Sequence, residues 1–205
     1  TTTQWRSSAA SDVYKRQNFN HPIAGVDEVG RGTLAGPVVA AAVILDYRNI
    51  PNGIKDSKKI SKKNRELISK YILETSIVSI GYSTSIEIDK INILKASLLA
   101  MKRAVEGLEK KPNIVLIDGN YVPDININAK PIVKGDNKSL SIAAASIVAK
   151  VYRDNLMTEY SKKYPGYLWE KNSGYGTKEH LEAIKKLGVT PIHRTSFKPI
   201  HNILN

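Results

Sequence analysis

The sequence predicts an α/β domain in which a mixed five-stranded sheet is flanked by helices. Two apolar, β-branched runs, residues 23–29 and 38–45, enclose a glycine-rich turn and are typical of a hairpin. After them, short apolar runs alternate with longer segments whose apolar residues recur at helical spacing. Strands that first follow one another and then alternate with helices indicate a sheet with antiparallel and parallel pairs.

The expected strands are short apolar runs rich in Val and Ile, bounded by polar or glycine-containing segments. They are residues 23–29, 38–45, 77–86, 114–117 and 132–134.

The expected helices carry apolar residues three and four positions apart. Ser61 can cap the first of them, with Leu67 and Ile68 on its buried face, and Gly188 ends the last. The four helices are residues 61–73, 89–108, 137–160 and 177–187.

The composition favours a polyanionic partner. The 205 residues contain 31 Lys and Arg against 19 Asp and Glu, so the net charge is 31 − 19 = +12. Cysteine is absent, which excludes disulfides, thiolate metal sites and a cysteine nucleophile. The longest apolar run, residues 35–45, is interrupted by Gly36 and Pro37 and is shorter than the roughly 20 residues that a membrane span needs.

The first residues differ in character from the rest of the chain. Residues 1–17 are polar, show no periodicity and contain no apolar segment of the kind found in signal peptides. We expect them to be a non-native or disordered leader, and we assign residues 18–205 to a single domain that includes a helical C-terminal part.

Four carboxylates are expected at the ends of strands. Asp27 and Glu28 lie in the first strand, Asp118 closes the fourth, and Asp136 closes the fifth. Functional groups in α/β sheets gather at strand ends. Two unit charges 4 Å apart repel by about 4 kcal/mol at an effective dielectric constant of about 20, so a cluster of acids needs a cation. Oxygen ligands without cysteine favour Mg²⁺ or Mn²⁺ over Zn²⁺.

Each acid taken alone also has an ordinary structural interpretation. Asp27 or Glu28 could be an exposed strand residue, although neighbouring side chains in a strand point to opposite faces. Asp118 precedes a glycine, which is a common turn pair, and Asp136 could cap the helix that follows. The functional hypothesis therefore rests on all four together.

The glycine-rich turn contains Gly30, Arg31 and Gly32. A strand rather than a helix follows it, so the dinucleotide-binding pattern does not apply. The turn could be a plain hairpin connection, but its glycines also let backbone amides approach a ligand beside one guanidinium.

Further candidates lie in loops. Lys58 precedes the first helix in a basic stretch and is placed like a phosphate ligand, although such stretches are usually solvated helix faces. Tyr175 lies between two glycines, where a tyrosine is more often a packed anchor than a ligand contact. His193 has no acid or second histidine at ligand spacing, so a structural role is expected for it.

Seven short motifs follow one another along the chain. They are GVDEVGRG at 25–32, DSKK at 56–59, IDG at 117–119, KGD at 134–136, AAASIVAK at 143–150, GYGT at 174–177 and HRTSF at 193–197. In type and order they resemble the motifs of the type 2 ribonucleases H, the ribonuclease HII family. Arg31 of the first motif resembles type HII, since the related type HIII enzymes usually carry Lys there. Thr33 departs from the proline common in the family.

The resemblance, which covers residues 23 to the C-terminus, implies a ribonuclease H-like fold and a cytoplasmic, monomeric endonuclease. Its expected substrates are RNA–DNA hybrids and duplex DNA with embedded ribonucleotides, nicked 5′ to the ribonucleotide with two Mg²⁺ or Mn²⁺ ions to leave 5′-phosphate and 3′-hydroxyl ends. The implied metal-binding carboxylates are Asp27, Glu28, Asp118 and Asp136. The implied substrate contacts are Gly30, Arg31 and Gly32 at the ribose 2′-hydroxyl, Tyr175 at the following sugar, and Lys58 and Lys134 at phosphates or the site wall.

Two other functions are compatible with parts of the sequence. A non-catalytic, basic nucleic-acid-binding module would account for the charge, but four acids at strand ends would oppose a polyanion unless metal lay between them. A small-molecule phosphatase could use the same metals, but it would leave the basic surface and the Tyr175 loop unexplained.

Overall fold

The computed structural model describes residues 22–54 and 60–204. Its sheet has five strands in the order β3-β2-β1-β4-β5, so β1 lies at the centre. The strands are β1 (Ile23–Val29), β2 (Val38–Ile44), β3 (Ile77–Ser83), β4 (Ile114–Asp118) and β5 (Ala129–Ile132).

The sheet is mixed, as the sequence predicts. β1 pairs antiparallel with β2, and β2 pairs antiparallel with β3. β1 and β4 are parallel neighbours, as are β4 and β5. Because β1 and β4 run in the same direction, their carboxyl ends lie at the same edge of the sheet. Asp27 and Asp118 are both near that edge.

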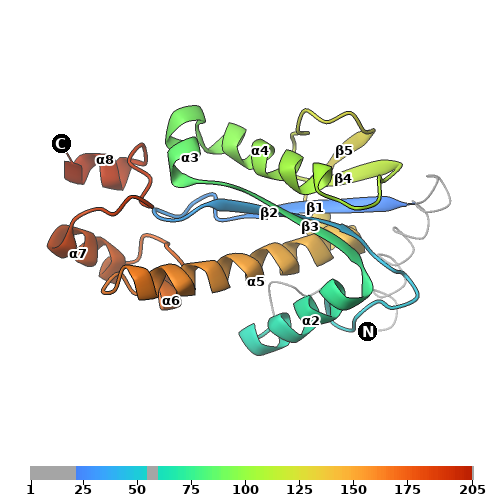
Figure 1. Cartoon of the computed structure of the whole chain (residues 1–205), viewed down its shortest axis with the longest axis horizontal. Helices are drawn as coiled ribbons and strands as arrows, with labels where there is room; N and C mark the ends of the chain where they lie inside the picture. The colour runs from blue at the N-terminus through green and yellow to red at the C-terminus, as the bar shows by residue number, and fades with distance from the viewer. Residues whose placement is uncertain (1–21, 55–59, 205) are drawn as a thin grey trace.

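Helices cover both faces of the sheet (Figure 1). One apolar cluster joins alternate residues of β1 and β2 to Ala96, Ala100 and Ala104 of α4. The opposite cluster joins the other residues of β2 to α5 and to Ile72 of α2. The helices that follow the hairpin are α2 (Lys62–Thr75), α3 (Ser85–Ile91), α4 (Ile93–Glu106), the 3₁₀ turn η2 (Gly135–Asn137) and α5 (Leu140–Lys163).

The C-terminal part forms a separate apolar cluster at one end of α5 (Figure 1). It comprises α6 (Trp169–Asn172), α7 (Lys178–Leu187) and α8 (Lys198–Leu204). Trp169, Ile184 and Ile200 are fully buried there. This cluster supports the loops between these helices, and it also supports the glycine-rich turn. Ala35, in the turn, forms an isolated antiparallel β-bridge with His193.

Several sequence-based boundaries were wrong. The helix expected over 89–108 is two helices, since Asn92 adopts a positive φ and its side chain caps α4. The fifth strand spans Ala129–Ile132, and the long helix begins at Leu140 after η2. Leu67 is 60% exposed, because the buried face of α2 runs through Ser69 and Ile72. Helices α6 and α8 were not anticipated.

None of the helices in the described segments is long and apolar enough to cross a membrane. The leader expected over residues 1–17 and the candidate Lys58 lie outside the described residues.

Candidate active site

A pocket of about 440 Å³ contains all four carboxylates singled out from the sequence. Of the described elements, the strands β1 and β4, the turn η2, the loop after α6 and the helices α2 and α5 contribute to its wall. The residues that line it are Asp27, Glu28, Val29, Arg65, Asp118, Asp136, Ser146, Ile147, Lys150 and Tyr175.

The backbone holds the acids in place. The Asp27 carboxylate accepts a hydrogen bond from the Glu28 amide at 2.8 Å. At the end of β4, Asp118 accepts one from the Gly135 amide at 2.6 Å, which ties this strand to the turn that carries Asp136. An added Cβ at Gly135 would lie 3.1 Å from that same Asp118 oxygen, so glycine permits the close approach. The pocket is therefore assembled from segments far apart in the sequence.

The acids lie in an environment that disfavours their charges. Burial raises the pKa of Asp27 well above its ordinary value, and the carboxylates of Glu28 and Asp118 raise it further, against a hydrogen bond from Ser146. Burial also raises the pKa of Glu28, whereas the Arg31 guanidinium, 3.2 Å from its carboxylate, lowers it. A cation in this pocket would favour the ionised acids.

The donor set fits a hard divalent cation. All four acidic side chains offer carboxylate oxygens, which are the ligands that Mg²⁺ and Mn²⁺ prefer. Within residues 22–54 and 60–204, however, no group of three or more His, Cys, Asp or Glu side chains is already arranged to hold an ion. The carboxylates thus share the pocket wall without forming a closed cage.

The glycine-rich turn lies beside the acids. Arg31 and Gly32 are exposed, whereas Gly30 is buried with a φ of +92°. A side chain at Gly30 would be strained by this φ and would meet the Arg153 guanidinium 2.2 Å away. The Arg31–Glu28 ion pair connects the turn to the acid pocket.

Tyr175 lines the pocket from the loop after α6 and is 42% exposed. The backbone of this loop is tied to the glycine-rich turn, since Leu34 donates its amide proton to the Gly174 carbonyl at 2.8 Å. Lys134, by contrast, is exposed and is not among the residues that line the pocket.

Three polar residues of the pocket were given no role from the sequence alone. Lys150 and Ser146 lie on α5, within the 143–150 motif, and Lys150 pairs with Asp154 at 2.7 Å. Arg65 of α2 belongs to the basic stretch in which only Lys58 was singled out from the sequence. The sequence signal that could have identified Ser146 and Lys150 is their spacing, because residues four apart lie on the same face of a helix.

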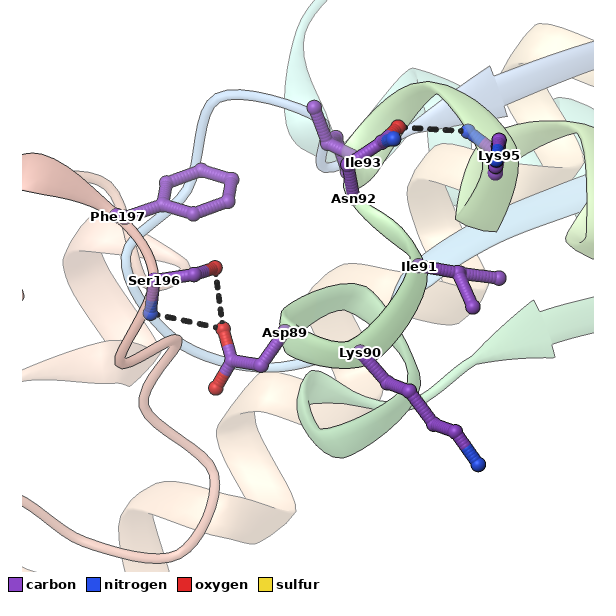
Figure 2. Close-up of a pocket in the computed structure, with 8 residues that line it drawn as sticks. All are labelled: Asp89, Lys90, Ile91, Asn92, Ile93, Lys95, Ser196 and Phe197. Atoms are coloured by element: carbon purple, nitrogen blue, oxygen red, sulfur yellow. Dashed lines mark hydrogen bonds between the residues drawn. The ribbon is translucent and has the colours of Figure 1, made fainter.

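A second hollow of about 530 Å³ lies where α3 and α4 meet the segment before α8. Figure 2 shows that Asp89 points at Ser196 rather than into open space. Its two oxygens accept hydrogen bonds from the backbone and hydroxyl groups of Thr195 and Ser196, at 2.6 to 3.0 Å. Asp89 therefore anchors the segment before α8, and the hollow lies beside this structural contact.

Comparisons with known proteins agree with these features. The sequence model of the family described as Ribonuclease HII matches residues 24–200. A relative from Rickettsia akari named ribonuclease HII is 57% identical over 187 residues, which are 90% of this chain and 95% of that protein.

Solved structures give the same picture. The crystal structure of the ribonuclease H2 from Pyrococcus horikoshii OT3 is 27% identical with a TM-score of 0.74, covering 89% of this chain and 97% of that one. Bst-RNase HIII in complex with Mn²⁺ has a TM-score of 0.77, covers 96% of this chain and 72% of that one, and at 21% identity shows likeness of fold alone.

Proposed function

The chain belongs to the ribonuclease HII family, and we propose that the carboxylates of Asp27, Glu28, Asp118 and Asp136 are its metal-binding catalytic groups. As a ribonuclease H, it is an endonuclease that hydrolyses the RNA strand of RNA–DNA hybrids and nicks duplex DNA 5′ to embedded ribonucleotides. The observation that carries the residue assignment is that four acids from distant segments line one pocket.

The pocket chemistry suits phosphodiester hydrolysis. Divalent ions bound there, which we propose to be two Mg²⁺ or Mn²⁺, supply a more acidic attacking water and stabilise the leaving oxygen. The chain's own acids would hold such ions, while Lys150 and Arg65 offer positive charge for the phosphates on either side. The expected products carry a 5′-phosphate and a 3′-hydroxyl.

Substrate recognition falls to two loops next to the acids. We assign Gly30, Arg31 and Gly32 to the ribose 2′-hydroxyl, the group that distinguishes RNA from DNA at one position. Tyr175, half-exposed on the pocket wall, is assigned to the sugar of the next nucleotide. Lys134, which does not line the pocket, and Lys58 remain our candidates for phosphate contacts. The basic surface would hold the duplex without sequence preference.

The site also bears on oligomeric state. We propose that the enzyme acts as a monomer, because one chain contains all four carboxylates that the proposed chemistry needs.

The experiment is cleavage of a duplex with one embedded ribonucleotide, with Mg²⁺ and with EDTA. Asp27→Asn and Asp118→Asn should each lower the rate by about a hundredfold or more, because metal-assisted stabilisation contributes several kcal/mol. They should also weaken Mn²⁺ binding measured by calorimetry. Asp124→Asn, at an exposed carboxylate paired with Lys102, is the matched control and should cleave normally.

Two results would contradict the assignment. Full cleavage by either variant would show that the substituted acid is not a catalytic group. Salt-sensitive duplex binding with no strand scission under any divalent ion would instead favour the non-catalytic binding module.

A further inference from the structure

Two fully buried arginines lie beneath the glycine-rich turn. Arg153 projects from α5, and Arg194 comes from the segment between α7 and α8. Both are 0% exposed. Burial lowers the pKa of Arg153 to about 10 and that of Arg194 to about 9, and the positive charge of Arg153 contributes to the second shift. Among the described residues, neither guanidinium has a carboxylate within ion-pair distance.

Arg194 is hydrogen-bonded to carbonyl groups of the turn itself. It donates from Nη2 to the Gly30 carbonyl at 2.6 Å and from Nη1 to the Arg31 carbonyl at 2.9 Å. Its Nε and Nη2 also donate to the Gly36 carbonyl at 3.0 and 2.9 Å. One planar group therefore fixes both ends of the turn.

Arg153 connects the turn to the Tyr175 loop. It donates to the carbonyls of Ala35 and Pro37 at 3.1 and 3.0 Å, and to the Thr33 hydroxyl at 2.8 Å. Its remaining hydrogen bond, from Nη1, goes to the Ser173 carbonyl at 2.8 Å. The same guanidinium thus holds the two loops that we assign to neighbouring sugars of the substrate.

The C-terminal segment that carries Arg194 is itself anchored. Asp89 of α3 accepts four hydrogen bonds from Thr195 and Ser196, the residues directly after Arg194. Figure 2 shows the two that come from Ser196. The Arg194 amide also donates to the Leu34 carbonyl at 2.9 Å. The guanidinium therefore approaches the turn from a fixed backbone.

Stability alone does not account for two buried cations. Taking a charge out of water is costly, and buried ionic groups can often be replaced by apolar residues without loss of stability. A guanidinium offers something that an apolar side chain lacks, namely five donors in a rigid plane. Here those donors set the positions of carbonyl groups in a loop with no regular secondary structure between residues 30 and 37.

We propose that Arg153 and Arg194 are positioning residues that hold the Gly30–Gly32 turn against the Tyr175 loop and thereby set discrimination between ribose and deoxyribose. This inference rests on the proposed function of the two loops. Neither arginine needs to touch the substrate, since each acts through the backbone that it holds.

The test compares binding to two duplexes of one sequence, one with a single ribonucleotide and one all-DNA. Arg153→Lys and Arg194→Lys keep the positive charge but lose the rigid plane of five donors. Both are measured by fluorescence anisotropy in Mg²⁺ and in an Asp118→Asn background, in which we expect cleavage to be too slow to affect the binding measurement. We expect the ratio of the two dissociation constants to fall at least fivefold, with the all-DNA constant changed less than twofold.

Arg103→Lys is the matched control, because Arg103 also donates to a backbone carbonyl, that of Tyr82, and lies outside both loops. It should keep the parent ratio. A purely structural role for the buried arginines would reduce the active fraction and affect both duplexes equally. An unchanged ratio in folded Arg153→Lys and Arg194→Lys proteins would overturn the inference.

A further variant tests the inference in case the arginine variants do not fold. Thr33→Val keeps the side-chain shape but removes the hydroxyl that accepts from Arg153 and donates to the Gly30 carbonyl at 3.1 Å. The ratio of the two dissociation constants should fall for Thr33→Val as well, and an unchanged ratio would again contradict the inference.

The proposed function of the loops is tested by the parent protein instead. If the parent binds both duplexes equally, that proposed function is overturned, whereas an unchanged ratio in the variants overturns only the inference about the arginines.

Discussion

His193 should make the protein less stable as the pH falls from 7 to 5. Its ring is 2% exposed and lies in the C-terminal cluster against Trp169 and Tyr167. The hydrogen bonds require the neutral ring, because Nδ1 accepts the Thr190 amide proton at 2.8 Å. Its Nε2 is 3.3 Å from Nε2 of His180, which already accepts from the Trp169 indole. The His193 proton is therefore on Nε2.

The magnitude follows from the pKa. Burial, with the neighbouring His180, lowers the pKa of His193 from 6.5 to about 4. Between these values the unfolded chain binds a proton that the folded chain does not, so stability is present above pH 6.5 and declines as the pH falls. At about 1.4 kcal/mol per pH unit, His193 alone should remove about 2 kcal/mol between pH 7 and pH 5. Burial also lowers the pKa of His180, so some pH dependence should remain without His193.

The assay is urea unfolding at pH 7 and pH 5, followed by circular dichroism. His193→Gln should be less stable than the parent at pH 7, because it loses the ring contacts, but its loss between the two pH values should be about 2 kcal/mol smaller. His201→Gln, at an exposed histidine of α8, is the control and should retain the parent's dependence. Equal losses in His193→Gln and parent would refute the reasoning.

Two further substitutions test the packing and the site. Gly25→Ala should lower the free energy of unfolding by about 1–3 kcal/mol or more, because the new Cβ would lie 2.1 Å from the Ser141 backbone of α5; a loss under about 0.5 kcal/mol in urea would contradict this packing. Tyr175→Ala should slow cleavage at a single ribonucleotide about tenfold or more while leaving Mn²⁺ affinity unchanged, because we assign this ring to the sugar. A parallel loss of Mn²⁺ affinity, measured by calorimetry, would count against that assignment.

The central sheet and the convergence of the acids were predictable from local sequence. Buried strands are short apolar runs, and the carboxyl ends of parallel strands share an edge, so acids placed after such runs meet. Asp118 and Asp27 follow this rule directly. Asp136 reaches the same pocket by way of η2, since the expected strand end at 134 lies two residues beyond the end of β5 at Ile132.

Other features could not be read from the sequence because they depend on tertiary contacts. The break at Asn92 interrupts an apolar pattern that is continuous through both α3 and α4, so periodicity alone predicts one helix. The buried Arg153 looks like any other basic residue of a charged helix, because what distinguishes it is the carbonyl groups of a loop more than 110 residues earlier. Lys150 could be linked to the site only through its spacing from Ser146, which is a weaker signal than the strand-end positions of the acids.

Among the described residues, the buried arginines and histidines of this fold lie beneath its two candidate substrate loops. Arg153 and Arg194 hold carbonyls of residues 30–37 from below, and His180 donates from Nδ1 to the Tyr175 carbonyl at 2.8 Å. The His180 ring is fixed by Trp169 and by His193. Such groups are costly to bury unless each hydrogen bond is made. Their placement under these loops, rather than under the sheet, is what a chain needs if its backbone must meet one sugar hydroxyl with fixed geometry.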